Sequence, residues 1–164
     1  MIRVGILSDT HYQIDNTIFK YLEPCDEVWH AGDIGSLDVS DKLAAFRPFK
    51  AVYGNIDNHD IRMVWPQVNR FQCENVDVLI KHIVGYPGRY DAGIRETLQN
   101  DPPKLLIAGH SHILKVQYDQ KHKLLFINPG AAGKQGFHQM RTLVRLTIDG
   151  SEMKDLEVVE LGKR

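Results

Sequence analysis

Cysteine is scarce in this chain of 164 residues: Cys25 and Cys73 are the only two, and they form no CxxC pair. Their number excludes a disulfide framework and a structural zinc site built on thiolates, so we expect two reduced thiols. Long apolar runs are also missing. The run after Met1 ends at Leu7, so it is too short for a signal segment or a membrane span. We therefore expect a cytoplasmic protein that does not engage membranes.

Neither sign of charge dominates, since 20 basic residues face 21 acidic ones and the formal net charge is −1. Proteins that bind nucleic-acid polymers normally neutralise several phosphates, and the sequence has no stripe of Lys and Arg for that purpose. Repeats, low-complexity tracts and Gly/Ser linkers are absent as well. Together with the length, this predicts one domain over residues 1–164 and argues against a nucleic-acid polymer as partner.

Short apolar runs alternate with helical patterns in the first third of the chain. Strands are predicted over residues 2–7, 27–30 and 50–53, with helices that begin near Asp15 or Asn16 and near Ser36 or Asp38. Further strands are predicted on either side of Glu74-Asn75 and over residues 104–108, 115–118, 124–127, 142–148 and 152–160, and a helix over residues 91–99. This order predicts an α/β fold with two sheets and helices outside.

Polar residues follow five of these strands at the point where each apolar run ends. The stretches read SDTH (8–11), GD (32–33), GN (54–55), H (82) and GHSH (109–112). Ligands of parallel sheets bind beyond the carboxyl ends of the strands, so the side chains should meet at one rim. They are Asp9, His11, Asp33, Asn55, His82, His110 and His112.

This mixture of imidazoles, carboxylates and one amide suits Mn, Fe, Co, Ni or Zn, and it has too few carboxylates for a calcium cage. Seven ligands are too many for one such ion but suit two if one carboxylate bridges them. Each motif alone is more often a turn, a cap or a packed histidine. All five in this order favour a site for two divalent metal ions, with Mn as the expected metal.

The series DxH, GD, GN, H and GHxH resembles the calcineurin-like metallophosphoesterase superfamily over residues 2 to about 148. INPGAAG at 127–133, in place of the family's usual NPGS, is similar to its small bacterial and archaeal phosphodiesterase-like branch. The resemblance implies a four-layer α/β/β/α sandwich of two mixed sheets flanked by helices. It also implies one ion on Asp9, His11, Asp33 and His112 and the other on Asp33, Asn55, His82 and His110, with Asp33 bridging.

Such a centre predicts hydrolysis of small phosphate esters by direct attack of a hydroxide that bridges the two ions, without a phospho-enzyme. Asn55 and His110 are the expected catalytic residues of the centre. In much of the family the GN motif continues to a histidine that protonates the leaving group, but here Ile56 follows. His59 is a candidate acid in its place, and Asp57 is expected to have a structural role. The missing histidine favours diesters and good leaving groups over alkyl monoesters.

Three residues are candidates for substrate contacts. Arg89 could hold a phosphate and Tyr90 could stack on a base or aryl ring, although an exposed Arg and a packed Tyr in a turn explain them equally well. His138, in a glycine-punctuated loop, is expected to face the site.

Two other functions stay open. One is an interaction scaffold of the same fold that is catalytically weak or inactive, and the other is a nuclease. The resemblance also suggests a homo-oligomer.

Overall fold

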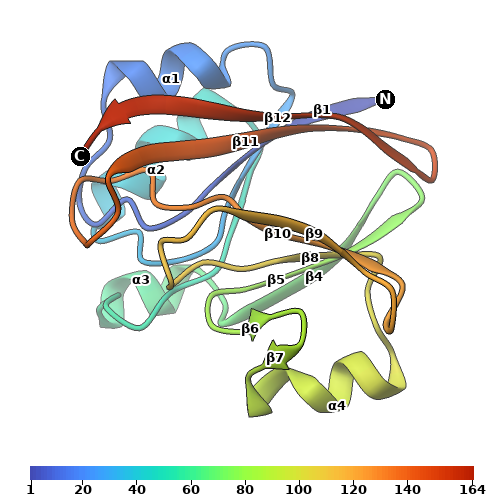
Figure 1. The fold of residues 1–164 in the computed structure, drawn as a ribbon. Coiled ribbons are helices and arrows are strands. Elements are labelled where there is room, and N and C mark those ends of the chain that lie inside the picture. Colours follow the sequence, from blue (N-terminus) through green and yellow to red (C-terminus); the bar gives the residue numbers. More distant parts are fainter.

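The computed structural model describes residues 1–164, and its two main sheets have five strands each (Figure 1). The first sheet has the order β12-β11-β1-β2-β3. Its strands are β1 (Ile2–Leu7), β2 (Glu27–His30), β3 (Phe49–Ala51), β11 (Met140–Asp149) and β12 (Glu152–Lys163). The strands β1, β2 and β3 are parallel, whereas β11 runs antiparallel to both β1 and β12.

The second sheet has the order β4-β5-β8-β10-β9. Its strands are β4 (Val68–Cys73), β5 (Val76–Lys81), β8 (Leu105–Ile107), β9 (Lys115–Asp119) and β10 (Leu124–Asn128). The central three are parallel, and the edge strands β4 and β9 are antiparallel to their neighbours. Both sheets are therefore mixed, as predicted.

A small hairpin and four helices complete the fold. The hairpin pairs β6 (Gly85–Tyr86) with β7 (Arg89–Tyr90), and the helices are α1 (Asn16–Leu22), α2 (Leu37–Phe46), α3 (His59–Val64) and α4 (Ala92–Asn100). None of these helices has the length and apolar character needed to cross a membrane.

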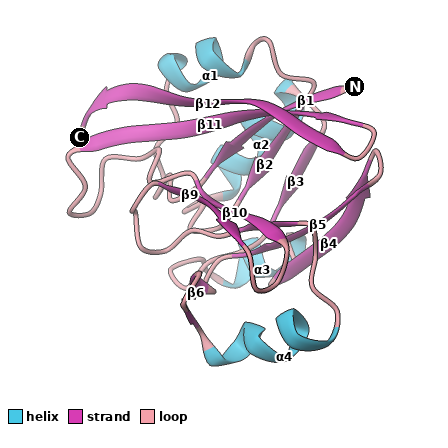
Figure 2. Cartoon of the chain, turned by 45° about the vertical axis from the view of Figure 1, so that its right-hand side comes forward, coloured by secondary structure: helices cyan, strands magenta, loops and turns pink.

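Alternation along the strands creates three separate apolar layers. In β1, Val4 and Ile6 lie in the core between the sheets, whereas Leu7 packs with α1 and α2 on the outer face. In β5, Val78 and Ile80 lie between the sheets, whereas Leu79 packs against α4. Because successive side chains point to opposite faces, each sheet is covered on both sides. Figure 2 shows α1 beyond one sheet and α4 beyond the other, and α2 packs in the same outer cluster as α1, which confirms the predicted α/β/β/α sandwich.

Most predicted elements are present, with two omissions. The α1 cap is Asp15, whose side chain accepts a hydrogen bond from Ile18 N. Helix α3 was not predicted, because it has six residues and buries only Ile61. The β6–β7 hairpin was also missed, since two-residue strands leave no period to detect.

Candidate metal centre

The loops after β1, β2, β3, β5 and β8 bring all seven predicted side chains to one edge of the sandwich. Two groups of three residues place their ligand atoms within 4.8 Å of one another: Asp9, His11 and His112 in the first, and Asp33, His82 and His110 in the second. Asn55 Oδ1 joins the second group, because it lies 3.1 Å from His82 Nε2 and 3.0 Å from His110 Nδ1.

The Asp9 carboxylate is fully buried and uses its two oxygens differently. Oδ2 accepts hydrogen bonds from Ser8 Oγ at 2.6 Å and from His110 N at 3.1 Å. Oδ1 has no hydrogen-bond partner and lies 3.1 Å from His112 Nε2 and 3.6 Å from His11 Nε2. One oxygen thus fixes the carboxylate, and the other is free to act as a ligand.

Asp33 repeats this division and joins the two groups. Its Oδ1 accepts a hydrogen bond from Ile56 N at 3.0 Å. Its Oδ2 lies 3.4 Å from His11 Nε2 in the first group and 3.2 Å from His82 Nε2 in the second. A single oxygen therefore faces imidazoles of both groups, which is the position a bridging ligand needs.

The backbone at these loops is strained. Asp9, His11, Asp33, His110 and His112 all have positive φ, between 45° and 71°. Residues other than glycine rarely adopt this region, and such strain concentrates at functional sites. Gly109 is required here, because a Cβ on it would lie 2.2 Å from Ser8 Oγ and 2.9 Å from Asp9 Oδ2.

Two imidazoles are oriented by hydrogen bonds on their far side. His82 Nδ1 lies 2.7 Å from Ala31 O, and a carbonyl only accepts, so Nδ1 donates there and Nε2 is the ring nitrogen that faces Asp33. His138 Nε2 likewise donates to Gly133 O at 2.8 Å, which leaves the Nδ1 of neutral His138 as an acceptor. That atom lies 3.3 Å from His112 Nδ1, so His112 donates there and its Nε2 is the ring nitrogen that faces Asp9.

The carboxylates and imidazoles shift one another's pKa strongly. The carboxylates of Asp33 and Asp9 beside its ring raise the pKa of His11 to about 9. Burial alone would raise the pKa of Asp33, but His11 and His82 outweigh it and hold that pKa far below its usual value. The same opposition, with His11 and His112 as partners, lowers the pKa of Asp9. The site therefore keeps two carboxylates ionised in a buried place.

These residues fit divalent cations. Asp9 Oδ1 and His11 Nε2 are buried without any hydrogen-bond partner, which is costly unless another group satisfies them. A cation beside each group would do so, and the mixed nitrogen and oxygen donors suit the later first-row metals. The role of the seven residues as metal ligands stays a prediction.

The other predicted residues lie around this centre. His59 is the exposed first residue of α3 and makes no hydrogen bond to the seven side chains. His138 reaches the centre through His112 and so stands behind a candidate ligand. Asp57 is buried and accepts hydrogen bonds from the backbone of Ile34, Gly35 and Gly54, in agreement with a structural role.

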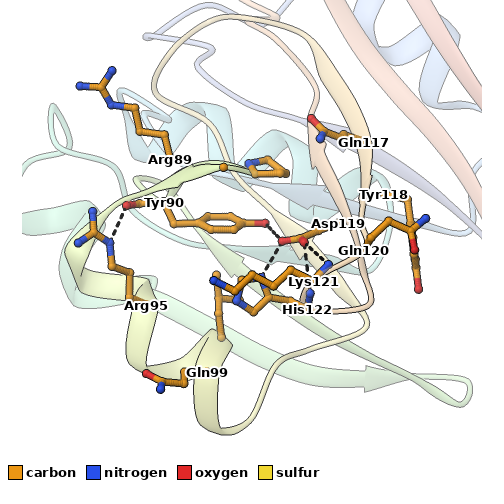
Figure 3. Close-up of a pocket in the computed structure, with 13 residues that line it drawn as sticks. Arg89, Tyr90, Arg95, Gln99, Gln117, Tyr118, Asp119, Gln120, Lys121 and His122 are labelled. Atoms are coloured by element: carbon orange, nitrogen blue, oxygen red, sulfur yellow. Dashed lines mark hydrogen bonds and ion pairs between the residues drawn. The ribbon is translucent and has the colours of Figure 1, made fainter.

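Of the two explanations given for Tyr90, the structure agrees with a packed side chain in a turn. Its side chain is only 8% exposed and packs edge-on against Phe126 and His122. Its hydroxyl donates to Asp119 Oδ2 at 2.6 Å (Figure 3). A ring held in this way serves as a buried wall and offers little face for stacking on a base. Arg89, next to it, is exposed.

Two contributors were missed by the sequence analysis. Ser8 fixes Asp9 through its hydroxyl, and Arg95, on α4, lines a cavity beside His110 together with Arg89. Ser8 is the first residue of the SDTH motif, so its position was a usable signal. No sequence pattern near Arg95 predicts that it lines this cavity, because α4 comes close to His110 only through the fold.

Two comparisons with known proteins point to the same family. The calcineurin-like phosphoesterase superfamily domain matches residues 2–151. A probable metallophosphoesterase of Methanothermobacter thermautotrophicus is 27% identical over 97% of this chain and 92% of its own length. The resemblance to the superfamily and to its archaeal members is thereby confirmed.

Solved structures agree on the fold. A novel archaeal phosphodiesterase superposes with a TM-score of 0.75 at 20% identity, over 96% of this chain and all of that one. Vps29 of Entamoeba histolytica, complexed with Zn²⁺, has a TM-score of 0.75 at 19% identity, over 98% of this chain and 100% of that one. With the family domain spanning nearly its whole length, the chain belongs to the calcineurin-like phosphoesterase superfamily.

Proposed function

We propose that this protein is a phosphodiesterase that uses two divalent metal ions, with Mn as the expected metal, to hydrolyse small phosphate esters. The observation that carries the proposal is the pair of buried carboxylates, each with one anchored and one free oxygen, with Asp33 Oδ2 facing imidazoles of both groups. Asp9, His11 and His112 would hold one ion and Asn55, His82 and His110 the other, with Asp33 shared. When bound, such ions activate water as the nucleophile and neutralise phosphate charge.

The chain's own residues set up this chemistry. Ser8 and the backbone of Ile56 fix the two carboxylates, and Ala31 and His138 fix the tautomers of His82 and His112. Second-layer contacts of this kind orient ligands and tune their basicity. The exposed His110 and Asn55 form the open side of the centre, where a phosphate can approach.

The expected leaving group follows from the lack of a proton donor next to Asn55. Ile56 cannot donate a proton from its side chain, and His59 is exposed on α3 outside the cluster. A diester with an acidic leaving group needs no proton at departure, whereas an alkyl monoester does. We therefore expect aryl diesters to be cleaved faster than alkyl monophosphates.

Hydrolysis of bis(4-nitrophenyl) phosphate by the Mn-loaded protein tests the proposal. Turnover should require added metal, and Asp33→Ala or His110→Ala should lower it by about 100-fold or more, because charge stabilisation at the phosphate is lost. Asp60→Ala, at an exposed position on α3 with no assigned role, is the matched control. Metal binding without turnover would favour the scaffold, and cleavage confined to DNA or RNA would favour the nuclease.

A further inference from the structure

A cavity lies directly beside the candidate metal centre and shares His110 with it. A cavity of about 630 Å³ is bounded on one side by His110 and its neighbours Gly109 and Ser111, and on the other by the β6–β7 hairpin and the start of α4. This volume is in the range of pockets that hold nucleotide-sized ligands. Arg89 and Arg95 both line it.

The side chains of these two arginines make few contacts within the chain. Arg89 makes no hydrogen bond or ion pair, and Arg95 uses only Nε, which donates to Tyr90 O at 3.0 Å (Figure 3). The other arginines, apart from the terminal Arg164, bind carboxylates or backbone carbonyls: Arg3, Arg47, Arg62, Arg70, Arg141 and Arg145. Two guanidinium groups at the rim thus keep donors for something outside the chain.

Neither of the nearby carboxylates, Asp119 and Asp91, forms an ion pair with Arg89 or Arg95. Asp119 accepts hydrogen bonds from the Tyr90 hydroxyl and from His122 Nδ1 at 2.8 Å, as well as from two backbone N–H groups. Asp91 caps α4 by accepting a hydrogen bond from Gly93 N at 3.1 Å. The Tyr90–Asp119 bond also ties the hairpin to the second sheet, so the backbone that carries Arg89 is held in place beside the cavity.

We infer that the preferred substrate carries a second phosphoryl group, which Arg89 and Arg95 bind in the cavity beside His110 while the scissile phosphate lies at the metal centre. The inference rests on the proposed function for the identity of that centre. A guanidinium presents paired donors that match the oxygens of a phosphate, and a simple diester has no second charge to use them. The substrate class is therefore a nucleotide-like diester with an additional phosphate.

Two nucleotides that differ by one phosphoryl group test the inference by binding alone. Calorimetry of the Mn-loaded protein should show thymidine 3′,5′-bisphosphate binding about tenfold more tightly than thymidine 5′-monophosphate, since one charge-assisted contact contributes about that factor. Arg89→Gln should abolish the difference without affecting folding, because the side chain has no partner in the protein. Arg95→Lys, which keeps the charge but loses the fork, should reduce it.

Lys154→Gln is the matched control, since it removes one positive charge from the exposed β11–β12 hairpin. Equal binding of the two nucleotides, or an equal loss in the Lys154 variant, would overturn the inference. Turnover separates this result from the proposed function: 4-nitrophenyl esters of the same two nucleotides report hydrolysis. Preferential binding without hydrolysis would support the inference and contradict the proposed activity.

Discussion

At the scale of single residues, the candidate centre depends on which atom of each side chain is left free. Asp9 and Asp33 each commit one oxygen to hydrogen bonds with the chain and present the other to the imidazoles. The sequence could predict the residue types and their order, because each follows an apolar strand. It could not predict the support of His112 by His138, since 26 residues separate them and folding of the loop brings them together.

His138→Phe should lower the affinity for one of two bound metal ions by about 10- to 100-fold, because the acceptor for His112 Nδ1–H is lost. Competition titration with a metal chelator measures this. Nitrogen NMR of the metal-free protein should also show His112 leaving its single tautomer, a change that general loosening would not confine to this ring. His59→Ala should change neither reading. Unaltered metal affinity in His138→Phe would refute the assigned role.

The raised pKa of His11 predicts an unusual pH dependence for the metal-free protein. The pKa of His11 is about 9 in the folded chain against 6.5 for a free histidine, because the carboxylates of Asp33 and Asp9 lie beside its ring. Between these values the folded state binds more protons than the unfolded state, so the free energy of unfolding should fall as pH rises from 6.5 to 9. Urea unfolding of chelator-treated protein measures this, and stability that rises over the interval would contradict it.

Metal affinity should rise over the same interval, since ligands must be deprotonated.

At the scale of elements, the loops after β2 and β3 are joined by Asp57. Its carboxylate accepts hydrogen bonds from Gly35 N at 2.8 Å, Gly54 N at 2.8 Å and Ile34 N at 3.1 Å. These loops carry Asp33 and Asn55, so one buried side chain fixes the loops that position both of these candidate ligands. An acidic residue after the GN motif could be expected to be structural from the sequence, but its bonds to Ile34 and Gly35 could not, because these two residues lie on the loop after β2.

Asp57→Ala should lower the free energy of unfolding by about 3 kcal/mol or more, because three buried N–H groups lose their acceptor. Denaturant unfolding of metal-free protein measures the effect without interference from bound ions. Asp60→Ala, at an exposed position on α3, is the control and should lie within about 0.5 kcal/mol of the unmodified protein. A loss below 1 kcal/mol for Asp57→Ala would contradict the role given to it.

At the scale of the whole molecule, the four layers could be predicted because apolar periods mark the strands and the helices between them. The order of the second sheet could not be predicted: β10 pairs in parallel with β8 and skips β9 in the sequence between them, and no local signal specifies such a pairing. The position of the candidate site could still be predicted from the sequence, for a different reason. Parallel strands bring their carboxyl ends together whatever their order, so the site is less sensitive to topology than the sheet itself.

Anomalous diffraction from crystals of the Mn-loaded protein tests the central claim most directly. Two manganese ions per chain are predicted, one held by Asp9, His11 and His112 and the other by Asn55, His82 and His110, with Asp33 in contact with both. A single ion, or ions bound elsewhere while Asp33 Oδ2 and Asp9 Oδ1 stay without a cation, would contradict the account.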